Sequence, residues 1–298
     1  MRRCGIPAGS PLDSQSSARL RDDPRALQRL QGDQKMNRRL LASLAPLLLA
    51  GSALANPPGP SYAVLSLVGD KLDIVTYQPQ VGSQLDSNSH LPLVMSQDEL
   101  DTVALRAVNR ALKSTAPGAS VALLAASTPD SFANQGSMFS GNHVTLPAEI
   151  DAAVHREGAT MLVLVTKHHG EARLKVADGY IGSGKLEGLG FYVDTDKHMK
   201  VRETGERSVG FLAPFVYVDA WMVDVATGTV TRHVTIMSGR AIPTSNNREG
   251  VSAWDALSTQ EKVATLKDML AEELAAAIPT LVTGAPVHAA AEATRLPQ

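Results

Sequence analysis

The sequence predicts an α/β fold: a mixed β-sheet flanked by helices, in a single layered domain with long β-hairpins. Two units in which a helix precedes an apolar strand follow one another between residues 96 and 166, which is typical of a layered α/β sheet. Further along, two strand-like segments joined by a short turn predict a long hairpin over residues 215–237. Together these patterns indicate one sheet with helices on its faces.

The domain is predicted to open with two strands, over residues 62–68 and 71–77. Gly69-Asp70 between them is a two-residue turn signal, so we expect these strands to form a hairpin. Residues 78–92 are polar and predict a loop.

The first predicted helix begins at Ser96, whose spacing from Glu99 is that of a capping box. Apolar residues then recur at helical spacing until Pro117-Gly118 end the unit. Residues 121–126 predict a short buried strand, and residues 127–145 predict a polar loop.

A second helix is predicted over residues 147–157, with Gly158 at its carboxyl-terminal cap. Residues 161–166 are apolar on both faces, as expected of a central strand that is covered on each side. Residues 179–194 are rich in glycine and predict an irregular ribbon or a bulge.

The long hairpin is predicted to consist of strands over residues 215–225 and 230–237. Ser258 and Glu261 form another capping-box pair and open the last helix. Because proline lacks a backbone N–H, we expect this helix to end at or just before Pro279.

A segment with the layout of a secretory signal peptide precedes the domain. Arg38 and Arg39 are followed by an apolar run over residues 40–50 and then by small residues, which predicts cleavage between Ala55 and Asn56. The run is about half of the roughly 20 residues that span a bilayer, and no cysteine follows it. We therefore expect a periplasmic protein without stable membrane insertion or a lipid anchor.

The polar residues before this signal leave two interpretations open. Translation begins at Met36, or the preceding residues form a genuine disordered leader. The predicted organisation is a leader or mis-annotated start over 1–35, a signal peptide over 36–55, a linker over 56–61, a single α/β domain over 62–283 and a disordered tail over 284–298.

Removing the leader and the signal peptide makes the chain acidic. Seven Lys or Arg and four Asp or Glu lie in residues 1–35 and two Arg in the signal, so Lys plus Arg falls from 28 to 19, Asp plus Glu from 30 to 26, and the net charge is −7. Nucleic acid is therefore not an expected partner. The only cysteine is Cys4, so the mature chain has no disulfide, thiolate metal site or cysteine nucleophile.

Two adjacent histidines are candidate binding residues. His168 and His169 follow the central strand, where open α/β sheets place their ligands. Adjacent residues of an extended chain point to opposite faces, so the pair cannot chelate one ion together, and neither a metal site nor a cofactor is predicted. The run from Gly179 to Lys185 has the spacing of a phosphate-binding loop, but Leu186 replaces the Ser or Thr that would hold magnesium.

Aromatic residues gather in the second half of the chain. Tyr217 and Trp221 share one strand face with Asp219, and core packing is the first interpretation of such a ribbon. If these rings are exposed, they form a patch for a partner or a ligand. No Gly-x-Ser-x-Gly motif occurs, and no catalytic residue is predicted.

Two short passages resemble domains of periplasmic assembly factors. Residues 157–164 (Glu-Gly-Ala-Thr-Met-Leu-Val-Leu) resemble their helix, Gly-Ala and buried-strand passage, and residues 223–230 (Val-Asp-Val-Ala-Thr-Gly-Thr-Val) are similar to their Asp-x-x-Thr-Gly hairpin. These domains belong to curli-secretion lipoproteins, penicillin-binding-protein activator lipoproteins and the Tol-system propeller protein, at its amino terminus. The resemblance covers residues 98–278 and implies a non-enzymatic domain that binds another envelope protein. The chain lacks the lipidated cysteine of the two lipoprotein groups, and an exported proteobacterial protein outside these groups fits equally well.

Three functions stay open from the sequence. The first is a soluble periplasmic accessory protein that binds an envelope partner. The second is an envelope hydrolase with a dispersed polar site near His168, His169 and Lys185. The third is a small-molecule carrier whose pocket is lined by the aromatic ribbon.

Overall fold

The computed structural model describes most of the predicted domain, within one compact unit over Leu54–Gln298. The described residues are 59–79, 86–95, 98–126, 128–200, 205, 207–244 and 252–284. The predicted leader, the signal peptide and the cleavage site between Ala55 and Asn56 lie outside the described residues, as do Ser96 and the tail beyond Gly284. No helix in the described part of the chain is long and apolar enough to cross a membrane.

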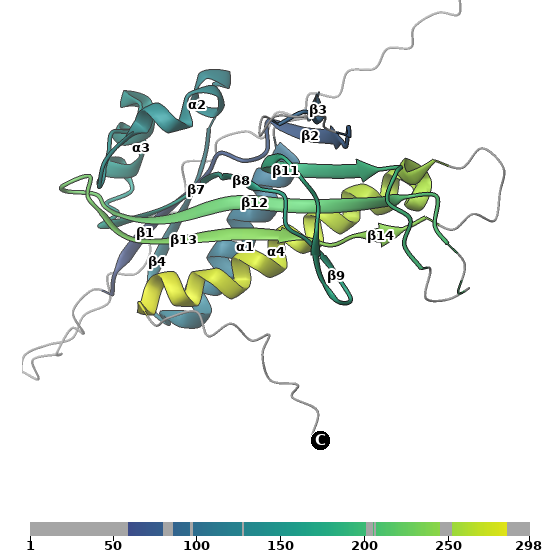
Figure 1. The fold of residues 1–298 in the computed structure, drawn as a ribbon. Coiled ribbons are helices and arrows are strands. Elements are labelled where there is room, and N and C mark those ends of the chain that lie inside the picture. The colour runs from purple at the N-terminus through teal and green to yellow at the C-terminus, as the bar shows by residue number, and fades with distance from the viewer. Residues whose placement is uncertain are drawn as a thin grey trace, which may run out of the picture. The chain divides into compact units, whose positions relative to one another are not determined.

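The fold is α/β, as predicted, with one large mixed sheet and helices packed against it (Figure 1). The strands are β1 (Ser61–Ser66), β2 (Lys71–Thr76), β3 (Ser89–Val94), β4 (Ser120–Ala125), β5 (Phe139–Ser140), β6 (His143–Val144), β7 (Met161–Lys167), β8 (His169–Glu171), β9 (Leu174–Val176), β10 (Gly179–Ile181), β11 (Lys185–Asp194), β12 (Phe211–Asp224), β13 (Val230–Gly239) and β14 (Ile242–Pro243). The α-helices are α1 (Asp98–Thr115), α2 (Pro129–Ala133), α3 (Ala148–Arg156) and α4 (Thr259–Thr283), and the 3-10 helices are η1 (Gln135–Met138) and η2 (Ala253–Ala256).

The long strand β12 is the central strand of the sheet and pairs with neighbours along both sides. Along one side it pairs with β13, which forms the predicted hairpin with it. Along the other side it has two successive partners: β7 pairs with residues 218–224 and β11 with residues 211–217. Because both partners lie on the same side of β12, β7 and β11 follow one another end to end.

Two blocks of strands therefore lie beside β12. The β7 block consists of β7, β1 and β4, which run parallel to one another. The β11 block consists of β11, β2 and β3, in which β2 is parallel to β11 and β3 is antiparallel to β2. The outermost strands, β4 and β3, leave one edge each without a partner strand among the described residues.

The predicted hairpin at Gly69-Asp70 is wrong, because β1 and β2 run in the same direction in different blocks. The buried carboxylate of Asp101 accepts hydrogen bonds from the Ser66 hydroxyl and the Val68 N–H. These bonds hold the segment that connects β1 in one block to β2 in the other. A Cβ at Gly69 would lie 2.5 Å from Oδ2 of Asp101. The glycine therefore permits a close approach of backbone and carboxylate and does not mark a two-residue turn.

Helices cover the two faces of the sheet unequally. On the first face, α1 and α4 pack side by side, α4 over β12 and β13 and α1 over β1 and β4 (Figure 1). Val216 and Val218 of β12 belong to the apolar core that both helices cover. On the second face, α2 and α3 pack over the β7 block, where Leu162 and Leu164 are buried. The β9–β10 ribbon covers the second face further along β12, with Leu174 packed in the same cluster as Phe215 and Tyr217.

Three edge and loop predictions need correction. Residues 89–92, placed in a predicted loop, belong to strand β3, which pairs with β2 along its whole length. Residues 121–126 were predicted as a buried strand, but 121–125 belong to the edge strand β4, which among the described residues pairs with β1 alone and is partly exposed. The predicted loop over residues 127–145 holds α2, η1, β5 and β6, whose residues Phe132 and Met138 are buried in the core of the second face.

The last helix passes its predicted end. Helix α4 continues through Pro279 to Thr283. Ile278 and Leu281 on either side of the proline are buried, so the apolar face of the helix continues and compensates for the missing backbone donor. Gly284, with φ +70°, ends the helix, and its N–H donates to the carbonyl of Thr280 at 2.8 Å.

Candidate functional site

Polar side chains gather where the two blocks meet. Strand β7 ends at Lys167, and the next residue, His168, donates its backbone N–H to Tyr217 on β12 and accepts from Gly188 on β11. Successive residues of an extended chain point to opposite faces, so Lys167 and His168 diverge. Two separate polar clusters result, one around Asp219 and one around the Lys167 ammonium.

The first cluster, the Asp219 cluster, consists of His168, Asp219, His233 and Thr235. Oδ2 of Asp219 lies 3.0 Å from Nδ1 of His168, and Oδ1 lies 2.8 Å from Nε2 of His233. The Thr235 hydroxyl donates to Oδ1 at 2.7 Å. An ionised carboxylate only accepts hydrogen bonds, so both imidazoles donate to it, and both of its oxygens have partners.

The aromatic neighbours of Asp219 are largely buried. The Trp221 ring stacks on His233 at 3.7 Å between centroids, and its Nε1 donates to the Thr166 hydroxyl at 2.9 Å. Tyr217 is fully buried, and burial raises the pKa of its phenol above the usual value although the Arg173 N–H donates to its oxygen. Tyr217 therefore belongs to the core and not to an exposed aromatic patch.

Among the described residues, no hydroxyl or thiol hydrogen-bonds to the second ring nitrogen of His168. A nucleophilic mechanism needs a hydroxyl or a thiol within hydrogen-bond reach of the base. The hydroxyl of Thr235 lies 3.3 Å from Nε2 of His233, but that nitrogen and the hydroxyl both donate to Asp219. The described residues also contain no group of three or more His, Cys, Asp or Glu side chains that could hold a metal ion.

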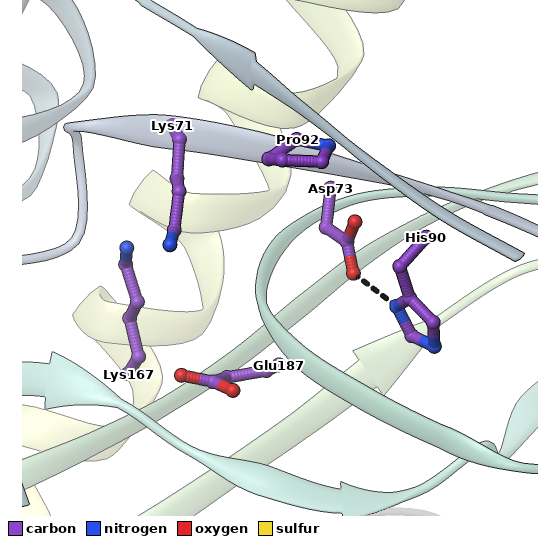
Figure 2. Close-up of a pocket in the computed structure, with 6 residues that line it drawn as sticks. All are labelled: Lys71, Asp73, His90, Pro92, Lys167 and Glu187. Carbon is purple, nitrogen blue, oxygen red and sulfur yellow. Dashed lines mark hydrogen bonds and ion pairs between the residues drawn. The ribbon is translucent and has the colours of Figure 1, made fainter. Parts of the chain in front are cut away.

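The second cluster lines a pocket of about 200 Å³, which we call the lysine pocket (Figure 2). Its residues come from both blocks and are Lys71, Asp73, His90, Pro92, Lys167 and Glu187. Figure 2 shows the terminal nitrogens of Lys71 and Lys167 pointing toward one another. On the other side, Asp73 holds Nδ1 of His90 at 2.6 Å.

Lys167 is held at the base of this pocket. Its side chain is 7% exposed, and its ammonium forms an ion pair with Asp70. Its backbone N–H donates to Oε1 of Gln135 at 2.9 Å. Gly188 has φ +68°, and a Cβ there would lie 3.1 Å from Cγ and Cδ of Lys167. A glycine at this position therefore leaves room for the lysine stem.

His90 links β3 to the pocket wall. Burial lowers its pKa, but the hydrogen bond and charge of Asp73, with a further contribution from Asp86, outweigh burial and raise the pKa overall. For Asp86, burial raises the pKa, but backbone N–H donation from Lys185 and Asn88 and the nearby His90 outweigh it, so the pKa is lowered. The two groups favour opposite charges, and the Lys185 N–H that donates to Asp86 joins the segment before β3 to the start of β11.

The structure separates the residues that the sequence marked as candidates. His168 and Asp219 meet directly, and Trp221 lies against the same cluster through His233. His169 points elsewhere, with Nδ1 3.6 Å from Oε2 of Glu187. The ammonium of Lys185 pairs with Glu171, apart from both clusters.

Several functional candidates escaped the sequence analysis. The predicted hairpin could have indicated that His233 and Thr235 lie near the candidate residues. His233 is opposite Trp221 and Thr235 is opposite Asp219 across its two strands. No comparable signal existed for Lys71 and Lys167, which come together only because β1 and β2 occupy different blocks.

The third feature is the edge strand β3, all six residues of which are exposed. Leu91, Leu93 and Val94 are 57%, 40% and 88% exposed. Met95 N–H donates to the Asp70 carbonyl, so the odd-numbered residues of β3 bond to β2 and the even-numbered residues point their backbone groups outward. Pro92 lies at an outward position, where its missing N–H costs no bond within the sheet.

Comparison with known proteins identifies no family. No family model matches the sequence, and no curated protein matches it. Among solved structures, the PelC dodecamer from Paraburkholderia phytofirmans is similar, with 13% identity, 75% of this chain and 89% of that chain covered, and a TM-score of 0.30. A putative neuraminyllactose-binding hemagglutinin homolog from Helicobacter pylori has 10% identity, coverage of 75% and 87%, and a TM-score of 0.36.

Proposed function

We propose that this chain is an exported accessory protein of the bacterial cell envelope, without catalytic activity, that binds another envelope protein through strand β3. The observation that carries the proposal is the open edge of β3, which exposes Leu91 and Leu93 on one face and Val94 on the other. The predicted signal peptide over residues 36–55 supports the location.

An apolar strand at an open sheet edge has a cost for a protein that works alone. Unpaired backbone groups and apolar side chains at an edge favour association with other chains, and natural proteins usually cover or charge such edges. The other outermost strand on this side of β12, β4, has one large exposed apolar residue, Leu123, at 43%, and β13 on the opposite side of β12 also has one, Met237, at 43%. The concentration of apolar surface on β3 therefore supports a binding role for that edge.

The chemistry of β3 indicates how a partner docks. Leu91 and Leu93 lie opposite Ile74 and Leu72 and extend the apolar first face past its helical cover. Because Pro92 removes the central outward donor, a partner strand cannot form an uninterrupted ladder along β3. Binding then depends on apolar contacts to the leucines, so the expected partner offers an apolar surface and not only a free strand.

A hydrolase is the second candidate, because the 3.0 Å contact of His168 with Asp219 is the base–orienter pair of many acyl-transfer enzymes. The accessory role predicts that a variant with both His168→Ala and His169→Ala, once shown to be folded, still captures its partner. Loss of the cellular function in that folded double variant, with partner capture intact, would instead support the hydrolase.

The proposal is tested by affinity capture from cross-linked cell envelopes. The tagged wild type is compared with the double variant Leu91→Ser, Leu93→Ser and with the control Leu123→Ser, which alters a leucine on edge strand β4 whose exposure, 43%, is close to the 40% of Leu93. We expect a stoichiometric envelope protein with the wild type and the control, and its loss with the double variant. Equal capture of the partner by all three proteins contradicts docking at β3. If the only protein captured is a second copy of this chain, the result contradicts a separate envelope partner and shows self-association instead.

The same sample tests export. Amino-terminal sequencing of the tagged protein in that sample is expected to show a chain that begins at Asn56. A mature chain that retains residues 36–55 contradicts cleavage of the predicted signal.

A further inference from the structure

One side of the lysine pocket has ammonium groups with unused hydrogen-bond donors, and the other side has carboxylates. We propose that it binds a small zwitterion that carries a carboxylate and a protonated amine, of the size of a free amino acid. This binding goes beyond partner docking and uses other residues, because Leu91 and Leu93 do not line the pocket.

The Lys167 ammonium is the first reason. An ammonium has three N–H donors, and buried donors in folded proteins are nearly always satisfied. The side chain of Lys167 is 7% exposed, and among the described residues its ammonium donates only to Asp70. Figure 2 shows this nitrogen at the pocket, so its remaining donors are available to a bound acceptor.

Lys71 is the second reason. Within the described part of the chain, its ammonium forms no hydrogen bond or ion pair, and it points toward Lys167 across the pocket (Figure 2). Two ammonium groups that face each other repel, and the single carboxylate of Asp70 balances only one of them. A ligand carboxylate has two oxygens and can accept from both lysines at once.

The acidic residues of the lining specify the rest of the ligand. The carboxylate of Glu187 lies 3.6 Å from the exposed His169 ring, which is beyond hydrogen-bond range, and is otherwise unpaired in the described structure. Asp73 is engaged by His90 at 2.6 Å. Glu187 is therefore the acceptor for a ligand ammonium, and the two carboxylates together oppose a dianion such as phosphate.

The volume sets the size of the ligand. The pocket measures about 200 Å³, somewhat more than the roughly 150 Å³ of a cavity that holds benzene. Pockets for drug-sized ligands start at about 300 Å³. A single amino acid fits this volume, and a peptide or an oligosaccharide does not.

Isothermal titration calorimetry on the mature protein tests the proposal. The probes are the free amino acids, with acetate, methylamine and inorganic phosphate as partial ligands. We expect at least one amino acid to bind at least tenfold more tightly than any partial ligand. Absence of amino-acid binding, or acetate or phosphate binding as tight as the best amino acid, overturns the proposal.

Two variants and a control assign the site. Lys71→Met is expected to weaken binding of that amino acid at least tenfold, and its exposed position keeps the fold intact. Glu187→Gln is expected to remove the preference for the amino acid over acetate. Lys185→Met, which alters a lysine outside the pocket, is expected to bind as the wild type does. Unchanged binding by Lys71→Met, or unchanged preference in Glu187→Gln, contradicts the assignment.

Discussion

The two blocks of strands beside β12 differ in how completely their polar and apolar groups are satisfied. In the β7 block, strand β7 is buried along its length except at its two end residues, and the adjoining Asp219 has partners for both oxygens. In the β11 block the edge strand β3 exposes its apolar residues, and the lysine pocket holds an ammonium, that of Lys71, without a described partner. Satisfied groups stabilise a fold, whereas unsatisfied groups on a rigid frame are available for binding.

This comparison assigns stability to one region and recognition to the other. Substitutions at satisfied polar groups should lower the free energy of unfolding and leave binding to any folded fraction intact. Substitutions on β3 or in the lysine pocket should remove binding with little change in stability. The following predictions test that division, from the largest expected effect to the smallest.

The largest effect is expected for Asp219→Ala. It removes the buried acceptor shared by His168, His233 and Thr235, and loss of a charged acceptor of several hydrogen bonds costs about 3 kcal/mol. Urea denaturation measures the change, with His169→Ala as a control that should change stability by less than about 0.5 kcal/mol. Equal stability of Asp219→Ala and the wild type would show that the Asp219 cluster is not a structural network.

A smaller loss of stability is expected for substitutions of Asp101, which binds the segment between β1 and β2. Asp101→Ala leaves the Ser66 hydroxyl and the Val68 N–H without their acceptor and should cost about 1–3 kcal/mol. Asp101→Asn keeps an acceptor oxygen in the same place and is expected to cost less. If the two variants lose the same stability, the hydrogen bonds to Ser66 and Val68 do not hold the connection.

Asp101 also predicts a pH dependence. Burial raises the pKa of its carboxyl above the ordinary value of 3.8, against the hydrogen bonds from Ser66 and Val68. A raised pKa means that the folded state binds the proton more tightly, so this contribution to stability is fully present below pH 3.8 and is lost as the pH rises through the raised pKa. Asp101→Asn should remove that part of the pH dependence in denaturation curves measured between pH 3 and 7. An unaltered profile contradicts the assignment to this residue.

The smallest effect is expected at His90, on the wall of the lysine pocket. Its pKa is raised above 6.5 by Asp73 and Asp86, in spite of burial, so its contribution to stability is present below pH 6.5 and is lost as the pH rises through the raised pKa. The side chain is 39% exposed, and solvent screening limits the contribution to less than about 1 kcal/mol. His90→Ala should flatten the stability profile between pH 5.5 and 8.5 by that small amount, and a change above 2 kcal/mol contradicts a screened surface pair.

The sequence predicted the elements whose stabilisation is local. Helices α3 and α4 and the β12–β13 hairpin follow from periodicity, capping residues and turn chemistry within a few residues of one another. Strand β3 was missed because it depends on pairing with β2, and Pro92 gives it no local strand signal. The β1–β2 hairpin was predicted wrongly because the residue that determines this connection, Asp101, lies more than 30 residues away in the chain.

The same distinction applies to the candidate sites. His168 and Asp219 were each predicted as candidates, but their contact joins residues 51 positions apart. The pocket at Lys167 depends on Asp70, which is 97 positions away, and on the end-to-end arrangement of β7 and β11. Spacing within a sequence carries no information about such contacts until the topology is known.

The most direct test of docking at β3 is site-specific photo-cross-linking in living cells. A photo-reactive p-benzoylphenylalanine replaces Val94, which is 88% exposed on β3, or Leu123, which is 43% exposed on β4. The account predicts a discrete adduct with one envelope protein from position 94 and none from position 123. Equal adducts from both positions, or an adduct from position 123 alone, would contradict the assignment of partner binding to β3.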